Sequence, residues 1–240
     1  MGCPDDAICD FSSLNGRTKE QFINEMMYHF FNHRIPDARI SRYVDEKTTR
    51  VFSDLENQDR TLKTFLSDEF YSIFTLNFLQ WYEDENRILY DVFHHQQVLL
   101  FAKELAERRI LMRKKSRRID GFSDSVEEYY NAYAKPYNLL IWHFALGGDQ
   151  PILNQKKDVD IISALHPAFD RILFAGIRGT FAKITGSVPS CVPRNKREGY
   201  KYIKTKISYY ELLDHVRKWM TKFGAPAITL EAYWKNSQPK

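Results

Sequence analysis

Apolar residues recur at helical spacing along most of this chain. Thr18 and Gln21 have the spacing of a capping box, and the apolar positions that follow them lie on one face of a helix. The pattern predicts a first helix over 19–33, which Pro36 would close. Residues 37–120 contain neither glycine nor proline, the usual helix breakers. Within that stretch the pattern predicts helices over roughly 37–55, 60–82 and 84–117.

The second half of the chain shows the same periodicity, interrupted by glycine. Three more helices are predicted, beginning after Ser125, near Pro167 and after Ser208 and ending before Gly147, Gly186 and Gly224. Two segments rich in β-formers, 200–207 and 227–233, predict strands that pair with each other.

These elements predict a mainly α fold, in which a bundle-like helical body carries a small C-terminal β element, possibly a two-stranded sheet. The expected organisation is an irregular N-terminal arm (1–17), a helical body (18–186) and a C-terminal segment (187–240) made of a basic loop followed by strand, helix and strand. The C-terminal segment need not be a separate domain.

Composition favours a folded intracellular protein. The chain has 240 residues, 43% of them hydrophobic and 15% aromatic, enough for a substantial core. Its three cysteines, at 3, 9 and 191, form no zinc or redox motif and are expected to be reduced thiols. No apolar run of about 18 residues occurs, so we expect no transmembrane segment and a cytoplasmic or nuclear location.

Positive charge is concentrated in two segments. The formal net charge is +4, and residues 108–118 contain seven cations and no acid. Residues 194–206 contain six cations and one acid, which leaves −8 for the rest of the chain. One or two cations at a helix end are explained by the helix dipole, but seven are not, and their repulsion calls for an anionic partner.

The charge pattern favours a nucleic acid as that partner. We expect sequence-nonspecific contacts, mainly to phosphates, because no helix presents Asn, Gln and Arg together for base readout. Tyrosines interleaved with or following the second segment favour single-stranded nucleic acid, since Tyr200, Tyr202, Tyr209 and Tyr210 could stack on unpaired bases. The predicted contact residues are Arg108, Arg109, Arg113, Lys114, Lys115, Arg117, Arg118, Arg194, Lys196, Arg197, Lys201, Lys204, Lys206, Tyr200 and Tyr202. A nucleoprotein, a replication accessory factor or a viral packaging protein would fit this description.

Two alternatives remain open. In the first, the basic helix end binds an acidic protein and no nucleic acid is involved. In the second, the helices hold a metal for an oxidoreductase, because three acid and histidine pairs have helical spacing. These weak ligand candidates are Glu25 with His29, Asp91 with His94, and Glu211 with His215. An oligomer would be compatible with either alternative.

The sequence leans away from an enzyme and predicts no cofactor. It has no glycine-rich phosphate loop, no G-x-S-x-G elbow and no H-E-x-x-H motif. Chance alone pairs acids with histidines readily in a chain with seven histidines and 31 acids. We therefore predict no catalytic residue.

Overall fold

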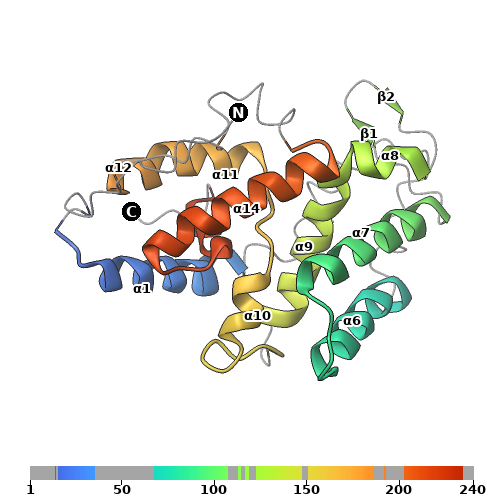
Figure 1. Ribbon diagram of the computed structural model, residues 1–240, viewed down its shortest axis with the longest axis horizontal. Helices are drawn as coiled ribbons and strands as arrows, with labels where there is room; N and C mark the ends of the chain where they lie inside the picture. The colour runs from blue at the N-terminus through green and yellow to red at the C-terminus, as the bar shows by residue number, and fades with distance from the viewer. Residues whose placement is uncertain are drawn as a thin grey trace.

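The computed structural model describes residues 14, 16–35, 68–107, 113–114, 117–118, 123–147, 151–185, 192 and 203–234 (Figure 1). The described part is mainly helical, as the sequence predicts. Its β structure is confined to two two-residue strands, β1 (Arg113–Lys114) and β2 (Arg117–Arg118). Within these residues, no helix is both long and apolar enough to cross a membrane.

The predicted N-terminal capping box is present. The Thr18 amide donates to Gln21 Oε1 over 2.9 Å, and the Gln21 amide donates to Thr18 Oγ1 over 3.1 Å. Helix α1 (Lys19–His29) follows and continues into the π-helical segment η2 (Phe30–Arg34). The helix predicted over 37–55 lies outside the described residues.

Helix α6 (Asp68–Glu83) ends within one residue of the predicted position, and residues 60–67 of that prediction lie outside the described residues. Helix α7 (Tyr90–Glu107) differs from its prediction at both ends. The helix expected over 84–117 begins six residues later than predicted, because a turn follows α6, fixed by the Trp81 Nε1 to Ile88 carbonyl hydrogen bond of 2.8 Å. It also ends at Glu107, before the basic block. Continuing the helix would place cations at i and i+4, an arrangement that destabilises helices.

Helices α8 (Ser123–Glu128) and α9 (Tyr130–Leu146) replace the single helix predicted after Ser125. The chain leaves helical geometry at Tyr129, with φ −123° and ψ 31°. Helix α9 is apolar around most of its circumference and contacts α6, α7, α8 and α14 (Lys206–Phe223). It is the central helix of the fold.

The segment after α9 contains short helices. Helix α10 (Val159–Ala164) is followed by α11 (Arg171–Gly176), the π-helical segment η4 (Ile177–Phe181) and α12 (Ala182–Thr185). The helix expected near Pro167 starts instead after Asp170, whose Oδ1 accepts hydrogen bonds from the Ile172 and Leu173 amides over 2.8 and 2.7 Å.

Helix α14 begins one turn before the predicted position. Thr205, not Ser208, is its N-cap, and Ser208 occupies the N3 position of the capping box. The predicted end is confirmed, because Gly224 adopts the left-handed conformation with φ 72°. The described part of the strand predicted over 200–207 is a turn that leads into this helix.

The strand predicted over 227–233 is wrong. These residues form the 3₁₀ helix η5 (Ala227–Tyr233), and all seven are buried. Segment η5 is surrounded by α1, η2, α10, α11, α14 and η4. Its neighbours among the described residues are all helical, and its backbone groups find partners locally, as in the Thr229 amide to Pro226 carbonyl bond of 3.0 Å.

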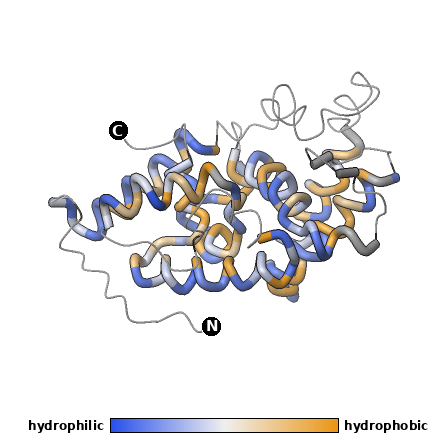
Figure 2. Tube along the Cα trace, turned by 90° about the horizontal axis from the view of Figure 1, so that it is seen from above, coloured by the Kyte–Doolittle hydropathy of each residue, from blue (hydrophilic) through white to orange (hydrophobic). Residues whose placement is uncertain are grey.

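The core extends between α9 and η5 and is rich in aromatic side chains. Phe74, Phe101 and Tyr137 join α6, α7 and α9 through ring contacts of 5.3 to 6.2 Å. Phe181 contacts Trp219 of α14 and Tyr233 of η5 at 4.9 and 5.0 Å. Figure 2 shows hydrophobic positions interleaved with hydrophilic ones along these helices, as packing on one face requires.

We predict that Gly176→Ala strongly destabilises the fold. A Cβ at position 176 would lie 1.8 Å from the Tyr233 carbonyl oxygen, so α11 and η5 would have to separate. Overpacking of this kind costs about 1 to 3 kcal/mol, or more where backbone must move. Urea unfolding measures the loss. Gly179→Ala is the matched control, because a Cβ there meets nothing within 4 Å. Equal stability of the two variants would contradict the packing.

Candidate functional site

Where the structure describes the first basic segment, it forms two short strands instead of a helix end. Strands β1 and β2 pair antiparallel, with Arg113 opposite Arg118 and Lys114 opposite Arg117. Both cross-strand pairs therefore join two cations, and like charges directly opposite each other destabilise an antiparallel pair. Arg108, Arg109 and Lys115 lie outside the described residues. The helix predicted over these residues is thus wrong at 113–114 and 117–118, where the structure has strands.

Where the structure describes it, the second basic segment contacts α7, α8 and Tyr129, the residue between α8 and α9. Lys204 Nζ lies 4.1 Å from the centroid of the Tyr129 ring, a cation–π contact. Lys206 Nζ lies 2.8 Å from His95 Nε2 and 3.5 Å from Glu127 Oε1. These two cations therefore already have partners within the chain. The remaining candidates, Arg194, Lys196, Arg197, Lys201, Tyr200 and Tyr202, lie outside the described residues.

The described parts of the two basic segments, β1 with β2 and residues 203–206, lie at the same end of the molecule. Strand β2 ends five residues before α8 begins, and α8 contacts α14, whose first residue is Lys206. Figure 1 shows the hairpin, α8 and the N-terminal end of α14 together at one end of the molecule. We call this region, defined by β1, β2, Lys204 and Lys206, the basic end.

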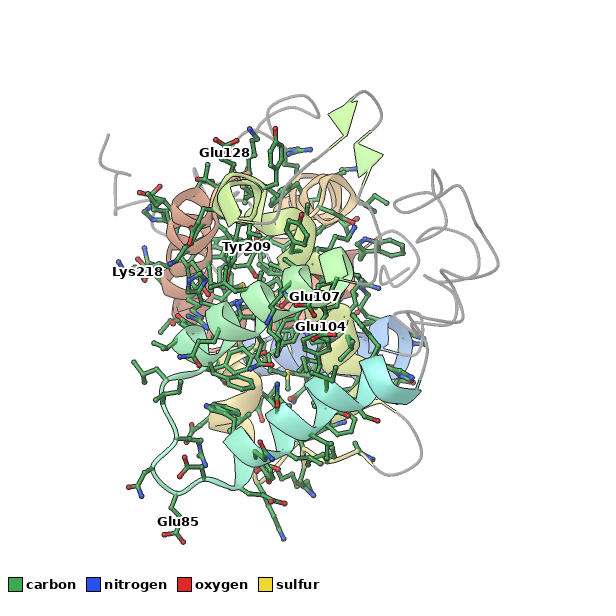
Figure 3. All side chains as sticks on the ribbon, turned by 90° about the vertical axis from the view of Figure 1, so that its right-hand side faces the viewer. Glu85, Glu104, Glu107, Glu128, Tyr209 and Lys218 are labelled. Carbon is green, nitrogen blue, oxygen red and sulfur yellow. The ribbon has the colours of Figure 1, made fainter. Side chains whose placement is uncertain are left out.

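Tyr209 and Tyr210, which follow the second basic segment, serve the interior. Tyr209 is 0% exposed, and Figure 3 shows it inside the body while Glu85 and Lys218 lie at the outer edge. The Tyr209 hydroxyl accepts from Asn138 Nδ2 over 3.1 Å and lies 3.2 Å from His166 Nδ1. A buried ring cannot stack on a base, so Tyr209 makes no contribution to nucleic-acid binding in this conformation.

A series of side-chain hydrogen bonds leads from the basic end into the core. Because the Lys206 ammonium can only donate, His95 accepts at Nε2 and carries its hydrogen on Nδ1, which donates to the Tyr130 hydroxyl over 3.3 Å. The Tyr130 hydroxyl lies 3.1 Å from that of Tyr210, which in turn lies 3.1 Å from His94 Nδ1.

The series of hydrogen bonds continues from His94 to Asn138. His94 Nε2 donates to Asn138 Oδ1 over 2.8 Å, since the amide oxygen can only accept. Burial, followed by the neighbouring His166, lowers the pKa of the His94 imidazole well below its usual range. The rings of His94 and His166 are 3.9 Å apart between centroids, a separation that two imidazolium cations would not tolerate. Both histidines are therefore neutral near pH 7.

The series of hydrogen bonds that begins at Lys206 ends in an ion pair at the surface. His166 Nε2 donates to Asp91 Oδ1 over 2.8 Å, and Arg217 holds both carboxylate oxygens over 2.7 and 2.9 Å. Although burial alone would raise it, these hydrogen bonds hold the pKa of the Asp91 carboxyl below its usual range. Arg217 also donates to the Ala164 carbonyl over 2.6 Å, which ties α14 to the end of α10.

Asp91, His166 and Tyr209 are hydrogen-bonded in the order acid, histidine and hydroxyl, as in a catalytic triad. In contrast to a triad, the acid is exposed to solvent and the hydroxyl is buried. The Asp91 side chain is 39% exposed, whereas His166 and Tyr209 are fully buried. A substrate would thus reach the carboxylate and not the hydroxyl that a triad needs as nucleophile. Burial also raises the pKa of the Tyr209 hydroxyl well above its usual range, which disfavours the phenolate. The arrangement fixes side chains and provides no nucleophile.

The three acid and histidine pairs do not assemble a metal centre. Glu25 Oε1 lies 4.0 Å from His29 Nε2, but the same carboxylate pairs with Arg17 over 2.9 Å. Asp91 and His94 are held by different partners in the series of hydrogen bonds described above, and Glu211 and His215 are exposed on α14. Among the residues that the structure describes, no group of three His, Cys, Asp or Glu side chains could hold a metal.

A second buried ionic site joins the N- and C-terminal parts of the chain. Arg34 is fully buried, and its Nε donates to Glu231 Oε2 over 2.9 Å. The guanidinium lies 4.5 Å from the Trp234 ring and 5.6 Å from the Trp142 ring. Glu231 Oε1 accepts from the Ala168 amide over 2.8 Å. Burial raises the pKa of the Glu231 carboxyl to about 7, against the opposing effect of Arg34.

Sequence reasoning missed most of the residues in these two sites. Tyr130 and Asn138 lie on α9, His166 follows α10 and Asp91 is on α7, so only tertiary structure brings these residues together. Glu231 carried a usable signal, because a single acid within the apolar run 227–233 needs a buried partner. Arg34, 197 residues away in the chain, could not be identified as that partner.

Comparison with known proteins gives no assignment. No protein-family model matches the chain, and neither the curated proteins nor the solved structures contain a significant match.

We predict that stability falls when the pH is lowered from 6.5 towards 4. Burial lowers the pKa of the His166 imidazole from 6.5 to about 4, although its bond to Asp91 acts in the opposite direction. Over this range the unfolded chain binds a proton that the folded chain does not, so acid favours unfolding, by on the order of 3 kcal/mol at pH 4. Urea unfolding at pH 5 and 7.5 measures the loss.

The control for this prediction is a histidine outside the core. His166→Gln should reduce the pH dependence of the unfolding free energy, whereas His215→Gln, on the exposed face of α14, should leave it unchanged. A pH dependence that survives His166→Gln in full would refute the assignment.

We predict strong coupling between Arg34 and Glu231. Arg34→Met or Glu231→Gln alone leaves a buried partner without its counter-charge, and such changes cost about 3 to 5 kcal/mol. The double variant Arg34→Met with Glu231→Gln should be much more stable than the sum of the single losses implies. Thermal and urea unfolding of all four proteins complete the cycle, and additive losses would contradict the pairing.

Proposed function

We propose that this protein binds nucleic acid at the basic end, through sequence-nonspecific contacts to phosphates. The observation that carries the proposal is that the described parts of two basic segments, about 90 residues apart in the sequence, lie near α8. A fold that needed these cations only for helix ends would have no reason to place them together.

The register of the hairpin supports an anionic ligand. Both cross-strand pairs of β1 and β2 consist of two cations, which weakens the pair in the free protein. A phosphate backbone would neutralise this repulsion and release its own counterions, so binding should depend steeply on salt concentration. The hairpin would then gain stability when the ligand binds.

The preference for a single strand depends on Tyr200 and Tyr202. Tyr209 is buried and unavailable for stacking, so these two tyrosines are the candidates that remain from the second basic segment. If they stack on bases, an unpaired strand should bind more tightly than a duplex of the same length. If only phosphates are contacted, a duplex should bind at least as well, because its charge density is higher.

An acidic protein is the second candidate partner. Lys206 lies 3.5 Å from the Glu127 carboxylate, so a carboxylate is an established partner for a cation of the basic end. A protein partner would bind with defined stoichiometry and modest sensitivity to salt.

We predict tight oligonucleotide binding at about 50 mM salt that weakens by orders of magnitude at 200 mM. Fluorescence anisotropy with single-stranded and double-stranded oligonucleotides measures it. Changing Arg113, Lys114, Arg117 and Arg118 to Gln should reduce the affinity at least tenfold and lower the slope of log K against log salt.

The control removes the same charge elsewhere. The variant with Lys156, Lys157, Lys218 and Lys222 changed to Gln loses four cations from the loop before α10 and from the later part of α14, away from the hairpin. It should bind nearly as well as the wild type. No binding by the wild type, or equal loss in both variants, would overturn the proposal and favour an acidic protein partner.

A further inference from the structure

Lys206, His95 and Glu127 contact one another at the basic end, and their contacts depend on whether His95 is protonated. Lys206 Nζ lies 2.8 Å from His95 Nε2, and Glu127 Oε1 lies 3.5 Å from the same ammonium. Glu127 Oε1 also lies 3.8 Å from His95 Nε2. The carboxylate is thus within reach of both nitrogens, and it can neutralise only one cation.

The observed arrangement requires a neutral His95. An ammonium offers hydrogens and no lone pair, so the 2.8 Å contact can form only when His95 Nε2 is unprotonated. His95 Nδ1 meanwhile donates to the Tyr130 hydroxyl over 3.3 Å, and this bond is compatible with either charge state. The ring therefore needs no rotation when a proton arrives at Nε2.

We propose that His95 acts as a proton-operated switch for Lys206, so that protonation of His95 frees the Lys206 ammonium to bind phosphate. This inference rests on the proposed function for its consequence, although the switch itself can be tested without a ligand. The proton binds at His95 Nε2, the Lys206 hydrogen bond is lost, and Glu127 becomes the counter-ion of the imidazolium. Lys206, whose side chain is 35% exposed, then turns towards solvent.

The charged and titratable groups around His95 are consistent with this exchange. Lys206 faces it from α14, Glu127 from α8, Tyr130 from α9 and His94 from its own helix. In the free protein, burial and then the Lys206 ammonium lower the pKa of the His95 imidazole, while Glu127 raises it. A phosphate that takes up Lys206 removes one of the two effects that lower this pKa, so binding and protonation favour each other.

The expected result is tighter binding at pH 5.5 than at pH 7.5. Fluorescence anisotropy with the better-bound oligonucleotide should show at least a threefold gain in affinity for the wild type. The slope of log K against log salt should steepen by about one at pH 5.5, because one more phosphate contact forms. Circular dichroism at both pH values checks that the protein remains folded.

Variants separate the switch from a general effect of acid. His95→Gln should abolish the gain, and Glu127→Gln should shift the gain to lower pH, because Glu127 raises the pKa of the His95 imidazole. Lys206→Gln should lose the steeper salt slope. His215→Gln, the control, should keep the full pH response. If Lys206→Gln retains the complete gain, the added charge on His95 acts directly and the switch is refuted.

A ligand-free measurement distinguishes failure of the switch from failure of the proposed function. Nuclear magnetic resonance of the histidine rings should show His95 as the Nδ1–H tautomer at pH 7.5, and the ¹⁵N signal of Lys206 Nζ should change as His95 titrates. Both observations would support the switch even if no oligonucleotide binds, which would overturn only the proposed function. A Lys206 signal that stays constant while His95 titrates would overturn the switch.

Discussion

The docking of α14 on α7 and α9 through buried hydrogen bonds is the interaction on which the rest of the structure depends. Tyr209 and Tyr210 reach His166 and His94 in the interior, and Arg217 closes the contact by holding Asp91. This docking fixes the position of Lys206 at the start of α14, beside α8. The basic end is therefore assembled by the core, and the second basic segment would have no fixed relation to the hairpin without it.

A buried polar chain is a demanding way to join helices. Each desolvated hydroxyl, amide and imidazole must find a partner, because an unsatisfied one costs about 1 to 3 kcal/mol. These hydrogen bonds fix a single register of α14 against α7 and α9, since a slip of one residue would break several of them at once. The Arg34 site differs, because its Nη1 and Nη2 find no hydrogen-bond acceptor among the residues that the structure describes, and two tryptophan rings flank the guanidinium. Both sites specify how distant parts of the chain meet.

Sequence periodicity predicted the helices better than their ends or their partners. Local signals were sufficient at Thr18 with Gln21 and at Gly224, where the cap lies within a few residues of the group it satisfies. The strand predicted over 227–233 failed because β-forming residues also suit a segment buried among helices, which are the neighbours of this segment in the described part of the chain. The network of His94 and His166 could not be predicted, because its members come from separate elements. The basic segments were visible from composition alone, but their convergence beside α8 was not.

The account makes the basic end the surface that contacts nucleic acid, and photo-cross-linking tests this most directly. A bromodeoxyuridine-substituted oligonucleotide would be irradiated with the full-length protein, and the cross-linked peptides identified by mass spectrometry. We predict cross-links within residues 108–118 and 194–206, including both segments in the same sample. Cross-links confined to other parts of the surface, such as α1 or the loop before α10, would contradict the account.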